Sequence, residues 1–546
     1  MKEGTAVPQT APLAPRTSGR RAENRTLTDA HAASGARIFL LSFLLIGALS
    51  TLWALASPLM SVPDEPAHTI KAAAVARGEL LGTPGAGQGD AAVVTVPAYI
   101  AAMDGQECYA FQPAVTADCA APVGDDTTPR TATTTAGNYN PLYYFVTGLP
   151  TLFAAGSPAI YAMRIVSALV CTAFLAMTFA AAAKFPKPGW PFAAAAVGLT
   201  PMVLFLNGAI NPNALEIAAA ASFFLNLCAV FQAGDKLAGV RSNIVFVGIS
   251  GAVLANTRPL SLLWIALGAA AALLIYGFKP LLAVLRNWLG LLMSILIGAG
   301  CAAALWWLVT ADSLRSLTGT PTGLTPEDAF LGMVERALDY GSGWIGRMGW
   351  LDTDLPNSIH VLWYVMMGAV LLAGLSARPL RARLAPVMLA LALVLVPAVL
   401  QAQVISELGW IWQGRYVLAL VLITLLCCGT VMRNSVLPAG PQARTIARLL
   451  VGLTVFAHLY AFVFSLRRYV AGLTGVPEWD LMFSNPAWQP PIPWQGLAAA
   501  YLVLLVLGGI ATYRYLYAPA VQGTPAVQGA PAVQGAAAAE KPATER

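Results

Sequence analysis

Long apolar runs separated by short polar turns make up most of this chain. The first run, residues 37–60, is long enough to cross a bilayer as a helix. Further runs follow at residues 160–183, 190–209, 214–233, 242–256, 259–278, 288–310, 358–376, 384–403, 414–433, 445–466 and 494–516. The pattern predicts an all-α polytopic integral membrane protein with about 12–13 transmembrane helices, the higher count including a modest apolar run at 141–157.

Basic residues in the turns predict the topology. Arg and Lys gather in alternate turns, which the positive-inside rule places in the cytoplasm. Twelve crossings satisfy the rule with both termini cytoplasmic, provided that 141–157 lies along the interface or re-enters. Residues 61–160 then form a large first extracytoplasmic loop, and residues 311–357 form a second, within a transmembrane domain at 37–516.

The two ends of the chain differ from this domain. Residues 1–36 are rich in Ala, Pro, Thr and Arg without hydrophobic periodicity, and we expect a disordered cytoplasmic tail. Residues 517–546 contain three tandem six-residue units ending in Pro-Ala-Val-Gln-Gly, which is low-complexity material without core-forming capacity. We expect this tail to be disordered as well.

Composition supports a membrane protein and excludes several function classes. The 546 residues are 57% hydrophobic and 11% charged, whereas soluble domains carry roughly 25% charged residues. The net charge of +6 is spread over many turns, so we expect no nucleic-acid partner. The chain has no Walker A motif, dinucleotide fingerprint, HExxH or serine elbow, so ATP hydrolysis, Rossmann cofactors and zincin chemistry are unsupported.

The strongest candidate for chemistry is the acidic pair Asp64 and Glu65, directly after the first apolar run. One carboxylate could act as a general base on a hydroxyl, and its neighbour could orient that hydroxyl or help to hold a divalent cation, Mg²⁺ or Mn²⁺. Repulsion between adjacent carboxylates would raise one pKa. Pro66 can open a helix reaching to about Leu80, so the alternative is an ordinary acidic helix cap.

Polar residues at other span ends fall on the same predicted outer side. His68 could hydrogen-bond the acidic pair, although a lone histidine is more often structural. Arg258 and Arg415 could each bind a phosphate bidentately or form a structural ion pair, with Glu216 the alternative partner of Arg258. The other members of this predicted site are Asn140, Tyr143, Arg164 and Gln413.

The second outer loop adds aromatic and acidic candidates. Trp350 could stack on a sugar or anchor at the membrane interface, where tryptophan is enriched. Asp352 could bind sugar hydroxyls, and the spacing of Asp352 and Asp354 is a weak metal signal. Cys108 and Cys119 both lie in the first loop and could form a disulfide if that loop is outside the cytoplasm.

The motifs together resemble a known group of proteins. They are Pro63-Asp64-Glu65-Pro66 with His68, Asn140-Pro141-Leu142-Tyr143-Tyr144, Asn211 to Glu216, Gly349 to Thr353, and Gln413 to Tyr416. Their order resembles an uncharacterised bacterial family of multi-pass membrane proteins, itself similar to the GT-C glycosyltransferases. Asn140 stands where GT-C relatives often have histidine, which departs from their pattern. The Ala- and Arg-rich composition is typical of a high-GC actinobacterium.

This resemblance implies a function. The chain would take a hexose or pentose, such as arabinofuranose or mannose, from a polyprenyl-phosphate donor. It would transfer the sugar with inversion to a cell-envelope glycan at the outer face of the cytoplasmic membrane. Asp64 or Glu65 would be the base, and an arginine would stabilise the departing lipid phosphate. The alternatives are a transporter or flippase of a lipid-linked glycan, for which no internal repeat is seen, and a non-catalytic assembly scaffold.

Overall fold

The computed structural model describes residues 18–84, 91–313, 320–474 and 479–517, with side chains from residue 35 onward. In these ranges ten helices are long and apolar enough to cross a membrane, three of them counted with the 3-10 turn that leads into them. They are α1 (Ser18–Ala56), α5 (Gly156–Ala182), α8 (Pro212–Ala233), α9 (Arg241–Ala255), α12 (Trp288–Thr310), α15 (Asn357–Leu375), α16 (Leu384–Leu408), α17 (Leu418–Val431), α18 (Pro441–Val470) and α20 (Trp494–Tyr517).

Two further spans are broken helices. Helices α6 (Gly189–Gly198) and α7 (Pro201–Asn207) meet at a 65° bend, and α10 (Ser261–Tyr276) and α11 (Lys279–Arg286) meet at 111°. The first break occurs because Thr200, which precedes Pro201, is extended and caps α7 by accepting a hydrogen bond from the Val203 amide. Counting each bent pair as one span gives twelve, so the predicted all-α polytopic membrane protein is confirmed.

The segment at 141–157 does not form a long helix. It folds into α4 (Pro141–Gly148) and a 3-10 turn, η3 (Leu149–Leu152), before α5 begins. Eight helical residues extend about 12 Å, far less than the hydrocarbon thickness of about 30 Å. This segment is therefore too short to cross as a helix.

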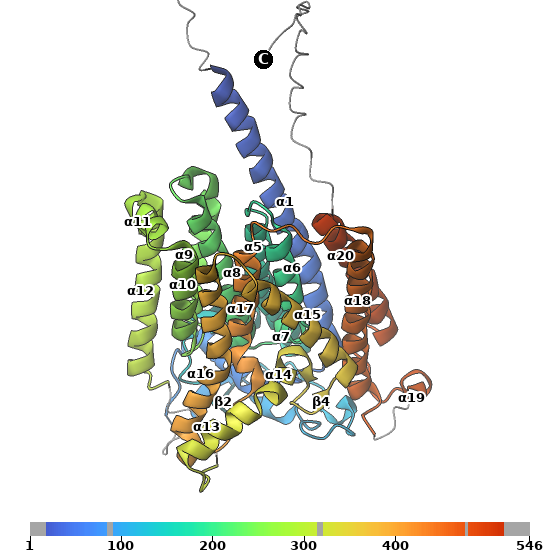
Figure 1. Cartoon of the computed structure of the whole chain (residues 1–546). Coiled ribbons are helices and arrows are strands. Elements are labelled where there is room, and N and C mark those ends of the chain that lie inside the picture. Colours follow the sequence, from blue (N-terminus) through green and yellow to red (C-terminus); the bar gives the residue numbers. More distant parts are fainter. Residues whose placement is uncertain (1–17, 85–90, 314–319, 475–478, 518–546) are drawn as a thin grey trace, which may run out of the picture.

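Burial separates the central helices from the peripheral ones. In α8 and in α17 with its leading turn, 94% of the most apolar stretch is buried, whereas the values for α12 and α20 are 11% and 17%. Helix α8 contacts α5, α9, α10 and α17. Figure 1 shows α12 on one flank of the bundle and α18 with α20 on the other. A central helix that is apolar all round is expected from this arrangement.

Small elements gather at one end of the bundle, the lower end in Figure 1. Strands β1 (Ala92–Pro97) and β2 (Pro129–Thr134) form an antiparallel hairpin in which Ala92 pairs with Thr134, and β3 (Arg347–Met348) pairs with β4 (Thr353–Asp354). The short helices are α2 (Glu65–Ala76), α3 (Ala98–Ala101), α13 (Pro326–Glu335), α14 (Ala337–Ile345) and α19 (Asp480–Ser484). A disulfide joins Cys108 to Cys119, whose Cα atoms lie 6.1 Å apart.

Two helix boundaries differ from the sequence predictions. Helix α1 begins at Ser18 rather than near residue 37, because Ala, Arg and Glu favour helix even without an apolar face. Helix α2 ends at Ala76 rather than near Leu80, since Gly78 adopts φ +91°. Residues 1–17 and 518–546, which make up about half of the first predicted tail and nearly all of the second, lie outside the described residues.

One arginine ties the disulfide loop to the last part of the bundle. Arg468, near the end of α18, is fully buried and donates to the carbonyl oxygens of Tyr109, Gln112 and Val115. It also pairs with Asp352, with Nη2 3.0 Å from Oδ2. Four acceptors on two loops thus depend on a single guanidinium.

We predict that Arg468→Met lowers the melting temperature of the purified protein far more than Arg467→Met. Removing one partner of a buried ion pair typically costs about 3–5 kcal/mol. Arg467 makes no side-chain hydrogen bond within the described ranges and lies over the Trp479 ring at 5.2 Å, so its loss should cost about 2 kcal/mol or less. Thermal unfolding in detergent measures both variants, and equal losses would contradict the assignment.

Candidate active site

Asp64 lies in the turn between α1 and α2, in a backbone conformation that is unusual for a side-chain-bearing residue. Its φ is +68°, and its carboxylate makes no cap hydrogen bond to α2. The carboxylate instead accepts from Arg415, with Nη2 2.6 Å from Oδ2. Residues held in the left-handed region cost free energy and occur frequently at functional sites. Asp64 is therefore positioned by the surrounding structure rather than serving as an ordinary helix cap.

The ionisation of Asp64 is set by two opposing effects. The Asp64 side chain is 51% exposed, yet protein surrounds it closely, so it lies in a recess among Arg415, Arg258 and His68. Burial raises the pKa of Asp64, but the Arg415 guanidinium, with help from Arg258, outweighs burial and leaves the pKa lowered. Asp64 is thus ionised at neutral pH while it remains in reach of solvent.

Glu65 faces away from this recess and is fully buried. Its carboxylate accepts from Arg164 twice, at 2.7 Å from Nε and 2.7 Å from Nη2. It also accepts from the amides of Ile210 and Val62. Four donors fill the carboxylate, and Arg164 is itself fully buried. In this structure Glu65 and Arg164 form an internal ion pair rather than a surface that a substrate could reach.

The adjacent carboxylates therefore have different partners, and this corrects two expectations. We predicted that repulsion would raise one pKa, whereas separate arginines neutralise the two groups and the pKa of Asp64 is lowered. We also considered both carboxylates as ligands of one cation, which their opposite directions do not allow. No cluster of three His, Cys, Asp or Glu suited to a metal occurs among the described residues.

His68 lies one turn into α2, beside Asp64. Its Nδ1 is 2.9 Å from the Tyr144 hydroxyl, and its ring centroid is 5.9 Å from that of Tyr139. Burial lowers the pKa of His68 to about 3, so the imidazole is neutral at pH 7. His68 and its two tyrosines form an aromatic wall of the recess rather than a second charge.

Arg258, between α9 and α10, forms the other side of the recess. Its Nη1 is 3.5 Å from Glu216 Oε2, too long for a hydrogen bond, and Nη1 has no hydrogen-bond partner in the described part of the chain. Its guanidinium lies over the Tyr416 ring at 4.9 Å, and that of Arg415 lies over the same ring at 5.5 Å. Both arginines thus approach one tyrosine, and the ion pair between Arg258 and Glu216 is a long one.

Arg415 is held by its own motif. Its Nε donates to Gln413 Oε1 at 2.7 Å, and its Nη1 donates to the Pro63 carbonyl at 3.3 Å. The turn packs so tightly on α14 that a Cβ at Gly414 would lie 1.9 Å from the Tyr340 carbonyl oxygen. Glycine at 414 is what lets this turn bring Arg415 to Asp64.

The remaining candidates support this site without lining it. Asn140 caps α4 and donates to Asn256 Oδ1, and the buried Tyr143 bonds Ser167. Trp350 donates to the Met60 carbonyl at 3.0 Å. Asp352 pairs with Arg468, so it is not free to bind a sugar or a metal in this structure.

Three site residues were missed from the sequence. They are Tyr139, Tyr144 and Tyr416, each beside a residue that the motifs had singled out. The signal was present in the paired aromatics of Asn140-Pro141-Leu142-Tyr143-Tyr144 and in Arg415-Tyr416. The sequence alone does not indicate which of Tyr143 and Tyr144 reaches His68.

Comparisons with known proteins identify the family. A family profile described as "Predicted membrane protein (DUF2142)" matches residues 44–424, so the chain belongs to that family. No curated protein matches.

Solved structures with some likeness include ArnT from Cupriavidus metallidurans. The form bound to undecaprenyl phosphate has a TM-score of 0.43 at 11% identity, covering 86% of this chain and 76% of that one. The apo form has a TM-score of 0.38 at 14% identity, covering 88% and 77%. A likeness this low establishes neither a shared fold nor a shared activity.

We predict that Glu65→Gln strongly destabilises the protein whereas Asp64→Asn does not. The first change leaves the buried Arg164 charge unpaired, at about 3–5 kcal/mol. The second affects a half-exposed carboxylate, and Arg415 keeps Gln413 and Pro63 as acceptors. Melting temperatures in detergent test this. Equal melting temperatures for the two single variants would refute the separation of roles.

Proposed function

We propose that this DUF2142 protein is an inverting glycosyltransferase in which Asp64 is the general base. It would move a sugar from a polyprenyl-phosphate donor to a hydroxyl of a cell-envelope glycan. The observation that carries the proposal is Asp64 itself, a half-exposed, ionised carboxylate in a left-handed backbone conformation, flanked by Arg415 and Arg258. A base beside two phosphate-binding cations is the arrangement that this transfer needs.

The proposed step is a single displacement. The acceptor hydroxyl gives its proton to an Asp64 carboxylate oxygen while its own oxygen forms a bond to the anomeric carbon. The bond between that carbon and the donor phosphate oxygen breaks, and its electron pair stays on the phosphate. Attack from the face opposite the leaving group inverts the anomeric centre. A phosphate leaves without a general acid.

The two arginines would act on the donor phosphate. Arg258 would add its positive charge, which a long ion pair of 3.5 Å with Glu216 only partly offsets, and Arg415 could share its guanidinium between Asp64 and a phosphate oxygen. Charged donors held in place before reaction stabilise the charge that develops on a leaving group. Neutral His68 would add a polar contact without repelling either cation.

Sequence features support the proposed donor class and membrane face. The resemblance of the motifs to GT-C enzymes supports a polyprenyl-phosphate sugar donor, and the positive-inside pattern supports an extracytoplasmic site. A divalent cation, if one takes part, would have Asp64 as its carboxylate ligand, because the carboxylate of Glu65 is already paired with Arg164. Mg²⁺ and Mn²⁺ therefore belong among the assay conditions.

We predict that Asp64→Asn abolishes transfer while the protein stays folded. Loss of a general base typically lowers the rate by about 10²–10⁴-fold. The assay offers purified protein a panel of polyprenyl-phosphate sugars and envelope glycans, with and without the cations. Asp126→Asn, at an exposed loop carboxylate, is the control and should keep wild-type activity. Wild-type activity in Asp64→Asn would exclude Asp64 as the base. If no donor reacts with wild-type protein, the transport and scaffold alternatives gain support instead.

We predict that the acidic limb of the pH–rate profile depends on Arg415. In the wild type the lowered pKa keeps Asp64 ionised, so kcat/KM should stay flat until the pH falls below the usual aspartate range, about 4. In Arg415→Gln, burial would raise the pKa of Asp64 without the compensating charge, and the acidic limb should move to higher pH. Arg347→Gln, which breaks the exposed pair with Asp354, is the control and should not move it. An unshifted limb in Arg415→Gln would contradict the pairing.

A further inference from the structure

A second polar recess lies at the opposite end of the helices from Asp64. It is a pocket of about 370 Å³ where the end of α10, the end of α15, the 3-10 turn η5 (Leu380–Arg383) and the end of α17 meet. Its lining includes three arginines and several neutral hydrogen-bonding groups, and no carboxylate. They are Arg378, Arg381, Arg433, Asn434, Ser376 and Ser435.

Arg433 is fixed in place by neutral partners only. Its Nε donates to Gln232 Oε1, its Nη1 donates to the Thr430 carbonyl at 3.2 Å, and its guanidinium lies over the Tyr276 ring at 4.6 Å. None of these partners carries a negative charge. A half-buried guanidinium without an anion is unfavourable, so a pocket that contains one favours an anionic occupant.

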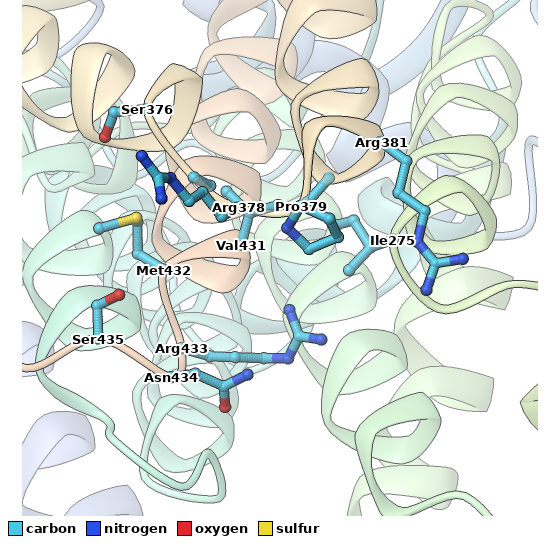
Figure 2. Close-up of a pocket in the computed structure, with 12 residues that line it drawn as sticks. Ile275, Ser376, Arg378, Pro379, Arg381, Val431, Met432, Arg433, Asn434 and Ser435 are labelled. Atoms are coloured by element: carbon cyan, nitrogen blue, oxygen red, sulfur yellow. The ribbon is translucent and has the colours of Figure 1, made fainter.

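Arg378 and Arg381 are exposed and make no side-chain hydrogen bond or ion pair within the described ranges. Figure 2 shows the Arg433 side chain rising toward Pro379, with Arg378 on one side of that proline and Arg381 on the other. An anion bound at Arg433 would thus have two further cations, Arg378 and Arg381, in the lining of the same pocket.

The common alternative is that these arginines only set topology or complement helix C-termini. Either role needs positive charge near the helix ends, but neither needs a cavity or a guanidinium held by three neutral groups. The neighbouring surface also contains exposed apolar side chains, Leu372 at 68%, Leu380 at 72% and Leu384 at 54%. Apolar groups beside a basic pocket suit an occupant with both a phosphate and acyl chains.

We propose that this pocket binds a phosphate group, with an anionic phospholipid headgroup as the source that the apolar flank favours. Arginine matches phosphate oxygens bidentately, and basic pockets between transmembrane helices bind anionic headgroups. A free phosphate offers the same oxygens without the chains. The site is independent of the proposed transfer reaction, and its test does not use that reaction.

The test compares two double variants of the full chain that lose the same charge. Arg378→Gln/Arg381→Gln removes the two pocket arginines without side-chain partners. Arg444→Gln/Arg514→Gln removes two exposed arginines at the same end of the bundle that do not line the pocket. Each protein in detergent receives phosphatidylglycerol, phosphatidylcholine or inorganic phosphate. Bound lipid is counted by native mass spectrometry, and stabilisation is read from the melting temperature.

We expect the wild type and the control to retain phosphatidylglycerol, and the pocket variant to bind it about tenfold or more weakly. Inorganic phosphate could instead stabilise the wild type and the control but not the pocket variant, with no protein retaining the lipid. That result would keep the phosphate site and assign its phosphate to a soluble source. Equal binding in all three proteins, or an equal loss in both variants, would overturn the proposal in favour of general surface charge. Arg433→Gln then checks the fixed cation, with its melting temperature confirming that it folds.

Discussion

The buried ion pair of Arg164 and Glu65 is the interaction on which the candidate site depends. The chain leaves α1 and turns into α2 within the protein, and its backbone carbonyl groups there must find donors. Arg164 donates to the carbonyl oxygens of Ala54, Ser57 and Pro58 as well as to Glu65. The Arg164 guanidinium on α5 thus supplies hydrogen-bond donors to the end of α1 and fixes Glu65, the first residue of α2.

Donors from other motifs hold the rest of this turn. The carbonyl of Leu59 accepts from Tyr109, that of Met60 from Trp350, and that of Pro63 from both Asn211 and Arg415. The motifs that looked like separate substrate contacts in the sequence are largely the scaffold of one turn. This explains why a loop with left-handed residues at Met60 and Asp64 can persist, since strain of this kind requires a surrounding structure that over-determines it.

Hydrophobic periodicity predicted the span pattern, and motif order singled out the turn at Asp64, but neither predicted which side chains pair there. Each apolar run predicts one helix without reference to the rest of the chain, so the number of spans can be predicted from local sequence. That Glu65 pairs with Arg164 and Asp64 with Arg415 depends on helices 99 and 351 residues away. Because Asp64 has a φ of +68°, the two adjacent carboxylates reach different partners. No neighbouring residue type predicts that backbone conformation. Likewise, only packing decides that Tyr144 meets His68 while Tyr143 meets Ser167.

The distribution of charge makes the two ends of the bundle chemically different. The five ion pairs within the described ranges, including Arg164–Glu65 and Arg415–Asp64, all lie at the end that contains Asp64. At the other end Arg378, Arg381 and Arg433 line a pocket without a carboxylate. Positive-inside bias accounts for an excess of arginine there, but it does not account for the lack of partners around a shaped pocket. Paired arginines can fix a carboxylate at one end, whereas arginines that lack an internal anion remain available to an external one.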